Sequence, residues 1–152
     1  MNEDYVSYDL ALKLKACGFD EPCIAQWACE PDGKPMLVGS TAFVFDNAGL
    51  KGRDVTAPFL WQAQKWLREK KDIVITIDFC PIDDSSMIYT YTINRYNPDG
   101  GKNIGDCWEV YCSLRGCGCC YSGGWDFYEE ALSAGIAAAL EMLYLPFTKQ
   151  KQ

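Results

Sequence analysis

The sequence predicts an α+β fold in which an antiparallel sheet carries its helices on one face. Three consecutive segments, 72–80, 87–96 and 107–115, alternate apolar and polar residues as half-buried strands do. An apolar stripe of helical period follows them, and a helix and a hairpin come before. The expected order is α-β-β and then α-β-β-β-α. At 152 residues, the chain is expected to form a single α+β domain, 1–152, with a sub-structure boundary near 40–56.

The N-terminal part begins with a helix expected from Tyr8 to Cys17, capped by Ser7 and stopped by Gly18. The stretch "CIAQWACEPDGKPMLVG" predicts two strands joined by a turn in which Asp-Gly supplies a positive φ. Residues 40–56 predict a short edge strand and a long loop.

A second helix is expected in "APFLWQAQKWLREKK", with Pro58 in its first turn. Lys70 and Lys71 would lie at the negative end of its dipole, which explains this basic cluster without a ligand. One face of the helix is apolar. Its residues are Leu60, Ala63 and Leu67.

The alternation within the three strands predicts which side chains meet the helices. The expected inward set is Ile73, Ile75, Ile77 and Phe79, then Met87, Tyr89, Tyr91 and Ile93, then Trp108, Val110, Cys112 and Leu114. A third helix follows, with Asp126 and Glu129 as its capping box and Pro146 at its end.

Charge and composition exclude several functions. The chain has 14 basic and 21 acidic residues, and the stretch from Asp72 to Thr148 has 11 acidic residues against three basic ones. A surface for nucleic acid needs clustered Lys and Arg, so we expect no nucleic-acid partner. The absence of histidine excludes Ser-His and Cys-His nucleophiles and zinc sites of mixed Cys/His type.

The expected compartment is the cytoplasm, without membrane association. The N-terminus "MNEDYVSYDL" is acidic and polar, whereas a signal peptide starts with basic residues and continues with an apolar core. No run of about 18 apolar residues occurs. The nine cysteines are therefore expected to be reduced thiols.

The stretch "RGCGCCYSGGWD" is the one that most resembles a metal or redox site. Cys117, Cys119 and Cys120 offer three thiolates, and Cys107 or Cys112 could add a fourth. Their C-x-C-C spacing is not the C-x2-C spacing of structural zinc sites, and no second knuckle occurs. We therefore interpret this stretch as a tight strand-to-helix turn, with no metal and no cofactor expected.

Asp78 and Glu109 are the carboxylates that best fit a metal-dependent enzyme. Both are expected on the outer face of the sheet, roughly 9 to 10 Å apart on strands separated by a third. Two carboxylates at that distance would need further ligands to hold an ion. We therefore expect no enzyme, with a metal-dependent enzyme as one alternative.

Three resemblances bear on function. The α-β-β-β-α order resembles double-stranded-RNA-binding domains in topology, but the last helix starts with "DFYEEAL" where those domains are basic. The stretch "CYSGGWDFYEEALSAGIAAALEML" is similar to the strand-turn-helix end of HicB-type antitoxins. Three further stretches, "YVSYDLALKLKACGFDEPC", "APFLWQAQKWLREKKDI" and "YEEALSAGIAAALEML", look like a family of short proteins of gut anaerobic bacteria and their phages or mobile elements.

The last resemblance implies an accessory role in a mobile element and carries over no functional residues. The sequence therefore predicts a small, non-catalytic interaction or accessory protein of phage or mobile-element origin, with a protein partner or self-association. A second alternative is an acidic inhibitor or antitoxin-like protein that imitates nucleic acid, for which a net charge of -7 is mild.

Overall fold

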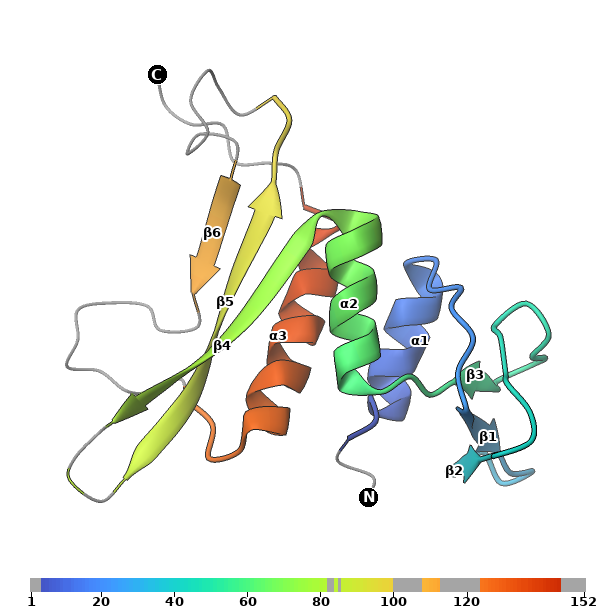
Figure 1. The fold of residues 1–152 in the computed structure, drawn as a ribbon. Helices are drawn as coiled ribbons and strands as arrows, with labels where there is room; N and C mark the ends of the chain where they lie inside the picture. Colours follow the sequence, from blue (N-terminus) through green and yellow to red (C-terminus); the bar gives the residue numbers. More distant parts are fainter. Residues whose placement is uncertain (1–3, 82–83, 85, 100–107, 113–123, 146–152) are drawn as a thin grey trace. The chain divides into compact units, whose positions relative to one another are not determined.

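The computed structural model describes residues 4–81, 84, 86–99, 108–112 and 124–145 (Figure 1). The chain divides into two compact units, Met1–Trp66 and Leu67–Gln152, so the division falls within helix α2 (Leu60–Lys71). The boundary expected near 40–56 lies inside the first unit. Each unit contains a three-stranded antiparallel sheet and helical residues, which confirms the α+β class.

The first unit starts with helix α1, Tyr8–Ala16. Ser7 caps it as predicted, because its Oγ accepts a hydrogen bond from the Leu10 N–H at 3.3 Å. The helix ends at Ala16, and Gly18, just beyond the C-cap Cys17, has a φ of 89°, the left-handed conformation that glycine adopts without strain. Leu10, Ala11 and Leu14 are buried, whereas Cys17 is only half-buried.

The predicted hairpin is confirmed. Strands β1 (Ala25–Cys29) and β2 (Pro35–Gly39) pair across a turn in which Gly33 has a φ of 85°. A short strand, β3 (Val55–Thr56), pairs with the other side of β1, so the order is β2-β1-β3. Helix α1 contacts β3.

The long loop before β3 is held by tertiary hydrogen bonds. Phe45 and Cys23 exchange backbone hydrogen bonds of 2.7 and 2.8 Å. Asn47 bridges two segments, since its Nδ2 donates to the Phe19 carbonyl at 2.9 Å and its Oδ1 accepts from the Thr56 N–H at 3.1 Å. The loop is therefore anchored to the segments before β1 and to β3 despite its irregular sequence.

Helix α2 begins three residues later than the sequence predicts. The preceding residues are extended because they pair with the N-terminal segment: Val6 donates to the Pro58 carbonyl at 3.0 Å, and Leu60 donates to the Asp4 carbonyl at 2.8 Å. The Tyr5 and Phe59 rings stack at 4.3 Å. Tertiary pairing thus outweighs the local preference of Pro58 for a first helical turn. The predicted apolar face is buried, at Leu60, Ala63 and Leu67.

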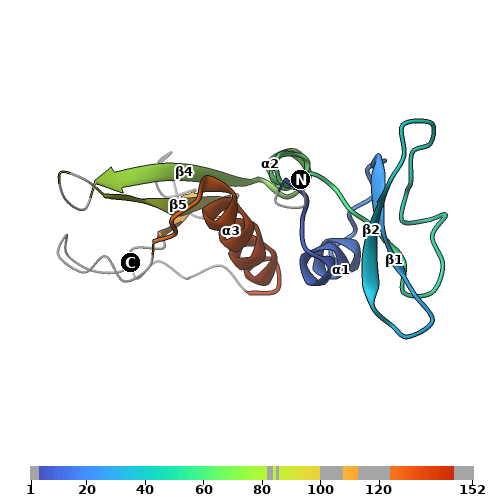
Figure 2. The ribbon, with the colours of Figure 1, turned by 90° about the horizontal axis from the view of Figure 1, so that it is seen from below.

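The second unit contains the predicted meander. Its strands are β4 (Ile73–Pro81), β5 (Met87–Tyr96) and β6 (Trp108–Cys112), in the order β4-β5-β6. Helix α3 (Tyr128–Met142) packs on one face of β4 and β5, as Figures 1 and 2 show from two directions. A Cβ added to Gly135 would meet Ile75 Cγ2 at 3.0 Å and Tyr91 Cβ at 3.2 Å, so glycine permits this close approach.

The inward set predicted for β4 and β5 is correct only beneath the helix. Ile73, Ile75 and Ile93 are buried, but Phe79 and Met87 are 66% and 55% exposed. Figures 1 and 2 show the reason: the β4–β5 hairpin projects beyond α3. Residues at this end keep the predicted face, but no described element covers them.

The predicted face of β6 is wrong. The register places Glu109 opposite Arg95 and Val110 opposite Asn94, so Glu109 shares the helix-bearing face and Val110 is 64% exposed. Trp108 and Cys112 are two residues from Val110 along the strand, and they lie opposite Tyr96 and Thr92. Leu114 lies outside the described residues. Because side chains alternate, choosing the wrong parity reverses every assignment in a strand.

The predicted cap of α3 is also wrong. Phe127, not Asp126, occupies the N-cap position, and no side chain caps the helix. Trp125 exchanges backbone hydrogen bonds of 2.7 and 2.9 Å with Tyr89 in β5, which keeps the chain extended up to Phe127 (φ -120°, ψ 145°). Glu129 and Glu130 lie in the first turn as expected, and Pro146 lies outside the described residues.

Gly124 should tolerate no side chain, because a Cβ there would lie 2.3 to 2.8 Å from three side-chain atoms of Ile88. We expect Gly124→Ala to lower the free energy of unfolding by about 1 to 3 kcal/mol in urea denaturation. In the background of Ile88→Ala the same change should cost less. Gly39→Ala is the control, because nothing lies within 4 Å of its added Cβ. Equal losses at both glycines would contradict the close approach.

Candidate functional site

The two carboxylates considered for metal chemistry are not brought together. Asp78 lies opposite Thr90 on β5, and Glu109 lies opposite Arg95. Positions 90 and 95 are five residues apart, which places them on opposite faces and about 17 Å apart along the strand. The expected arrangement, a shared face at roughly 9 to 10 Å, is therefore wrong, and a metal-dependent enzyme loses its proposed ligand pair.

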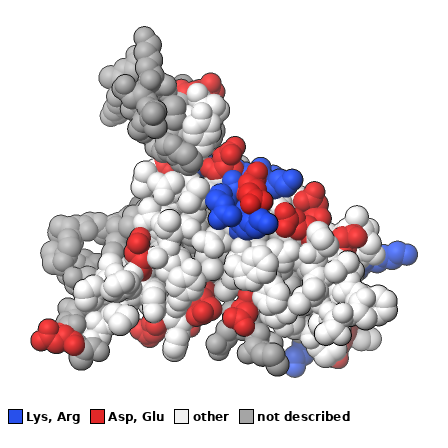
Figure 3. Space-filling view, viewed as in Figure 1, with Lys and Arg blue, Asp and Glu red and all other residues white. Residues whose placement is uncertain are grey.

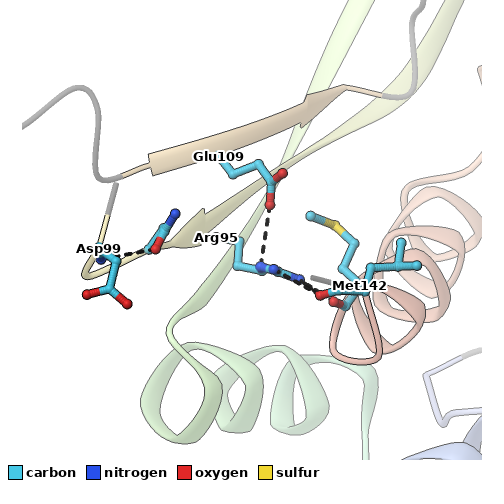
Figure 4. Close-up of polar contacts among 6 residues, drawn as sticks. Arg95, Asp99, Glu109 and Met142 are labelled. Atoms are coloured by element: carbon cyan, nitrogen blue, oxygen red, sulfur yellow. Dashed lines mark hydrogen bonds and ion pairs between the residues drawn. The ribbon is translucent and has the colours of Figure 1, made fainter. Parts of the chain in front are cut away.

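Glu109 has a different partner. The guanidinium of Arg95 lies with its Nε 3.4 Å from Glu109 Oε2, and Arg95 is only 5% exposed (Figure 4). Its Nη1 and Nη2 each donate to the Leu145 carbonyl at 3.1 Å, and Nη1 also donates to the Met142 carbonyl. A buried charge is tolerated only when it is paired and hydrogen-bonded in this way.

The Arg95 contacts join three elements. Arg95 comes from β5, and its carboxylate partner comes from β6. One carbonyl is that of Met142, the last residue of α3, and the other is that of Leu145, just beyond the helix end where the dipole is negative. The carbonyls at a helix end lack intrahelical donors. Here the Met142 carbonyl accepts from the Leu145 N–H at 3.1 Å and from the guanidinium. This arrangement has a structural explanation and does not by itself provide a catalytic group.

The cysteine turn cannot be placed. Cys107, Cys117, Cys119 and Cys120 lie outside the described residues, and the side chain of Cys112 is not described. Within the part of the chain that the structure describes, no three His, Cys, Asp or Glu side chains are grouped closely enough to hold a metal ion. The interpretation of this stretch as a turn stays a prediction.

Two thiols of the first unit have defined surroundings. Cys23 is buried, and its Sγ lies 3.5 Å from the Glu21 carbonyl and 3.7 Å from Gln62 Oε1. Burial raises the pKa of Cys23 to about 11, because the thiolate would lose its hydration. Cys29 is half-buried, with its Sγ 3.3 Å from the Tyr8 hydroxyl. Neither position resembles an activated nucleophile.

The exposed end of the second unit carries an apolar surface, which we call the terminal patch. It consists of Phe79, Met87, Phe127 and Tyr128, which are 66%, 55%, 62% and 41% exposed. Tyr89 connects its parts, since it lies opposite Phe79 in the sheet and its ring contacts the Tyr128 ring edge-on at 6.0 Å. Phe79 and Met87 thus continue the sheet's inner face beyond α3, and Phe127 and Tyr128 stand at the start of the helix.

Sequence reasoning missed both the Arg95 contacts and the terminal patch. The sequence did contain one signal for the Arg95 contacts. Arg95 alternates in phase with Tyr91 and Ile93 and therefore faces the core, where a buried cation needs an acidic partner. Glu109 is the acidic residue within β6. The patch had no such signal, because alternation does not reveal where a covering helix ends.

Arg95 should contribute strongly to folding. Arg95→Met removes the hydrogen bonds to the Met142 and Leu145 carbonyls together with the ion pair to Glu109, and we expect it to lower the free energy of unfolding by about 2 to 4 kcal/mol. Glu109→Gln should cost less, because it keeps the size of the side chain and Glu109 is partly exposed. Chemical denaturation measures both. Similar values for the two variants would mean that the ion pair, rather than the carbonyl contacts, dominates.

Cys23 should react slowly with alkylating reagents. A pKa of about 11 leaves about one thiol in a thousand ionised at pH 8, against about one in four for an ordinary cysteine. Iodoacetamide labelling followed by peptide mass spectrometry should show Cys23 reacting at least about tenfold more slowly than the half-buried Cys80. Its rate should keep rising between pH 8 and 10. Equal rates at pH 8 would contradict the raised pKa.

Comparisons with known proteins add no assignment to this geometry. No protein-family model, no curated protein and no solved structure matches the chain. No helix among the described residues is sufficiently long and apolar to cross a membrane.

Proposed function

We propose that this chain is a small, non-catalytic interaction protein, an accessory protein of a phage or mobile element that works in the cytoplasm. The observation that carries the proposal is the terminal patch, where four large apolar side chains are between 41% and 66% exposed at one end of a sheet. Exposed apolar surface of this kind is typical of protein-binding sites.

The composition of the patch fits a protein partner. Aromatic residues and methionine are enriched at the centres of protein interfaces, where they provide contact area. Met87 belongs to a strand paired on one side with β4, and Tyr128 is held by its ring contact with Tyr89. A partner would thus meet side chains fixed on regular elements, which lowers the entropic cost of binding.

The charge around the patch indicates the chemistry of that partner. Glu129 and Glu130 are exposed in the first turn of α3, directly after Tyr128. An acidic rim favours a partner with basic residues around an apolar centre and repels phosphate groups. This is why we propose a protein partner and no nucleic acid.

The acidic-mimic alternative has less support. A protein that imitates nucleic acid needs carboxylates in a regular row, whereas Figure 3 shows acidic residues scattered over the visible face beside a basic cluster. The last turn of α2 supplies Arg68, Lys70 and Lys71, and Arg68 pairs with Glu69 at 3.7 Å. No further observation favours this alternative.

The partner surface can be tested with the full-length chain. Met87→Lys combined with Tyr128→Lys should abolish retention of a co-purifying protein, and should weaken the purified pair at least tenfold by calorimetry, because it places charge in an apolar contact. The control is Thr76→Lys with Val110→Lys, two exposed positions on the opposite face of the sheet. Binding that survives the first pair of changes, or is lost equally with both, would contradict the proposal.

A further inference from the structure

The long strand β4 lies at an edge of its sheet. In the described part of the second unit the strand order is β4-β5-β6, so β4 pairs with β5 alone. The pairing runs through nine consecutive residue pairs, from Ile73 to Pro81, without a bulge. An edge strand presents a row of N–H and C=O groups that can pair with another chain.

The hydrogen bonds of Tyr89 identify which groups of β4 point outward. Both the N–H and the C=O of Tyr89 bond to Trp125, on the side of β5 away from β4. Phe79, which lies opposite Tyr89, is therefore in a non-hydrogen-bonded pair, and its own N–H and C=O point away from β5. The same alternation turns the N–H and C=O of Ile77 and the C=O of Pro81 outward.

This end of the edge carries only part of the protection that usually prevents pairing. Charged side chains, proline, bulges and inward charges protect most edge strands. The segment Ile77–Pro81 has no lysine and no bulge, and its protective residues are Asp78 and Pro81. Its proline removes one N–H at the strand's end, but Phe79 is 66% exposed on the same edge. Apolar exposure and outward backbone groups thus coincide at Phe79.

We propose that a second copy of this chain adds to β4 in antiparallel orientation, with the two-fold axis at Phe79. This contact shares Phe79 with the terminal patch, but it is made by the edge of β4 and does not require the partner proposed above. Each Phe79 N–H would donate to the Phe79 carbonyl of the second copy, and each Ile77 N–H would donate to the opposite Pro81 carbonyl. The two sheets would form one continuous sheet of six strands, and the two exposed Phe79 side chains would lie next to each other.

Charge disfavours one neighbouring register. With the axis at Phe79, Asp78 lies opposite Cys80 of the second copy. A shift of the axis by one residue toward the N-terminus would place the two Asp78 carboxylates directly opposite each other, which is unfavourable for a cross-strand pair. A shift by one residue in the other direction would place Phe79 opposite Pro81, whose nitrogen has no hydrogen to donate. A second copy is favoured over an unrelated strand because the segment is complementary to itself, as a two-fold interface requires.

Sedimentation equilibrium of the full-length chain tests the proposal. The wild type should show a reversible dimer of twice 17.1 kDa. Phe79→Lys should weaken dimerisation at least tenfold, because it places two ammonium groups side by side, and the thermal unfolding of the variant should confirm that it folds. Met87→Lys is the control, since Met87 is similarly exposed but lies on β5. It should remain dimeric even if it loses the partner of the terminal patch.

A cross-link fixes the register independently of that comparison. In a hydrogen-bonded antiparallel pair the two Cα atoms are about 5.5 Å apart, within the range of a disulfide. In a Cys80→Ser background, Phe79→Cys should therefore give an oxidised dimer linked through position 79 itself, whereas Met87→Cys and the Cys80→Ser protein alone should give no such dimer. A wild type that is monomeric at every concentration, a Phe79→Lys variant as dimeric as the wild type, or a monomer that captures another extended segment at β4 would overturn the proposal.

Discussion

The second unit depends on one buried cation. Arg95 lies on the central strand, pairs with a carboxylate of β6 and donates to the carbonyls of Met142, at the end of α3, and of Leu145, just beyond it. The sheet's outer strand and the end of the helix are therefore held by the same guanidinium. The planar group suits this position because it offers several donors in a fixed geometry. Its contacts fix one end of α3, and the Gly135 approach to Ile75 and Tyr91 fixes the middle.

The other end of the same sheet has the opposite character. There the strands continue past the helix, and the apolar face that α3 covers near Ile75 is exposed at Phe79 and Met87. One alternating pattern therefore serves two purposes along the length of β4. Near the start of the strand it builds a core, and near the end it provides the surface on which the proposed function depends.

The sequence predicted the elements of this fold better than their surroundings. Three strands, a hairpin and three helices follow from periodicity and turn residues, since these are local properties. The start of α2, the cap of α3 and the inner face of β6 were wrong, because each is decided by a distant partner: Asp4 and Val6, Tyr89, and Arg95 respectively. The terminal patch could not be predicted either, because its exposure depends on where α3 lies over the sheet. The expected pairing of Asp78 with Glu109 failed with the face of β6.

The contact between Trp125 and Tyr89 has a consequence for how far an assembly could grow. Tyr89 lies opposite Phe79, and Trp125 is bonded to Tyr89 on the side of β5 that faces away from β4. This contact is an isolated bridge, and the chain continues from it directly into α3. Among the described residues, this end of the sheet is therefore closed on one side and open on the other. Strand addition through a single open edge ends once two copies have met, whereas two open edges would allow a fibre to propagate.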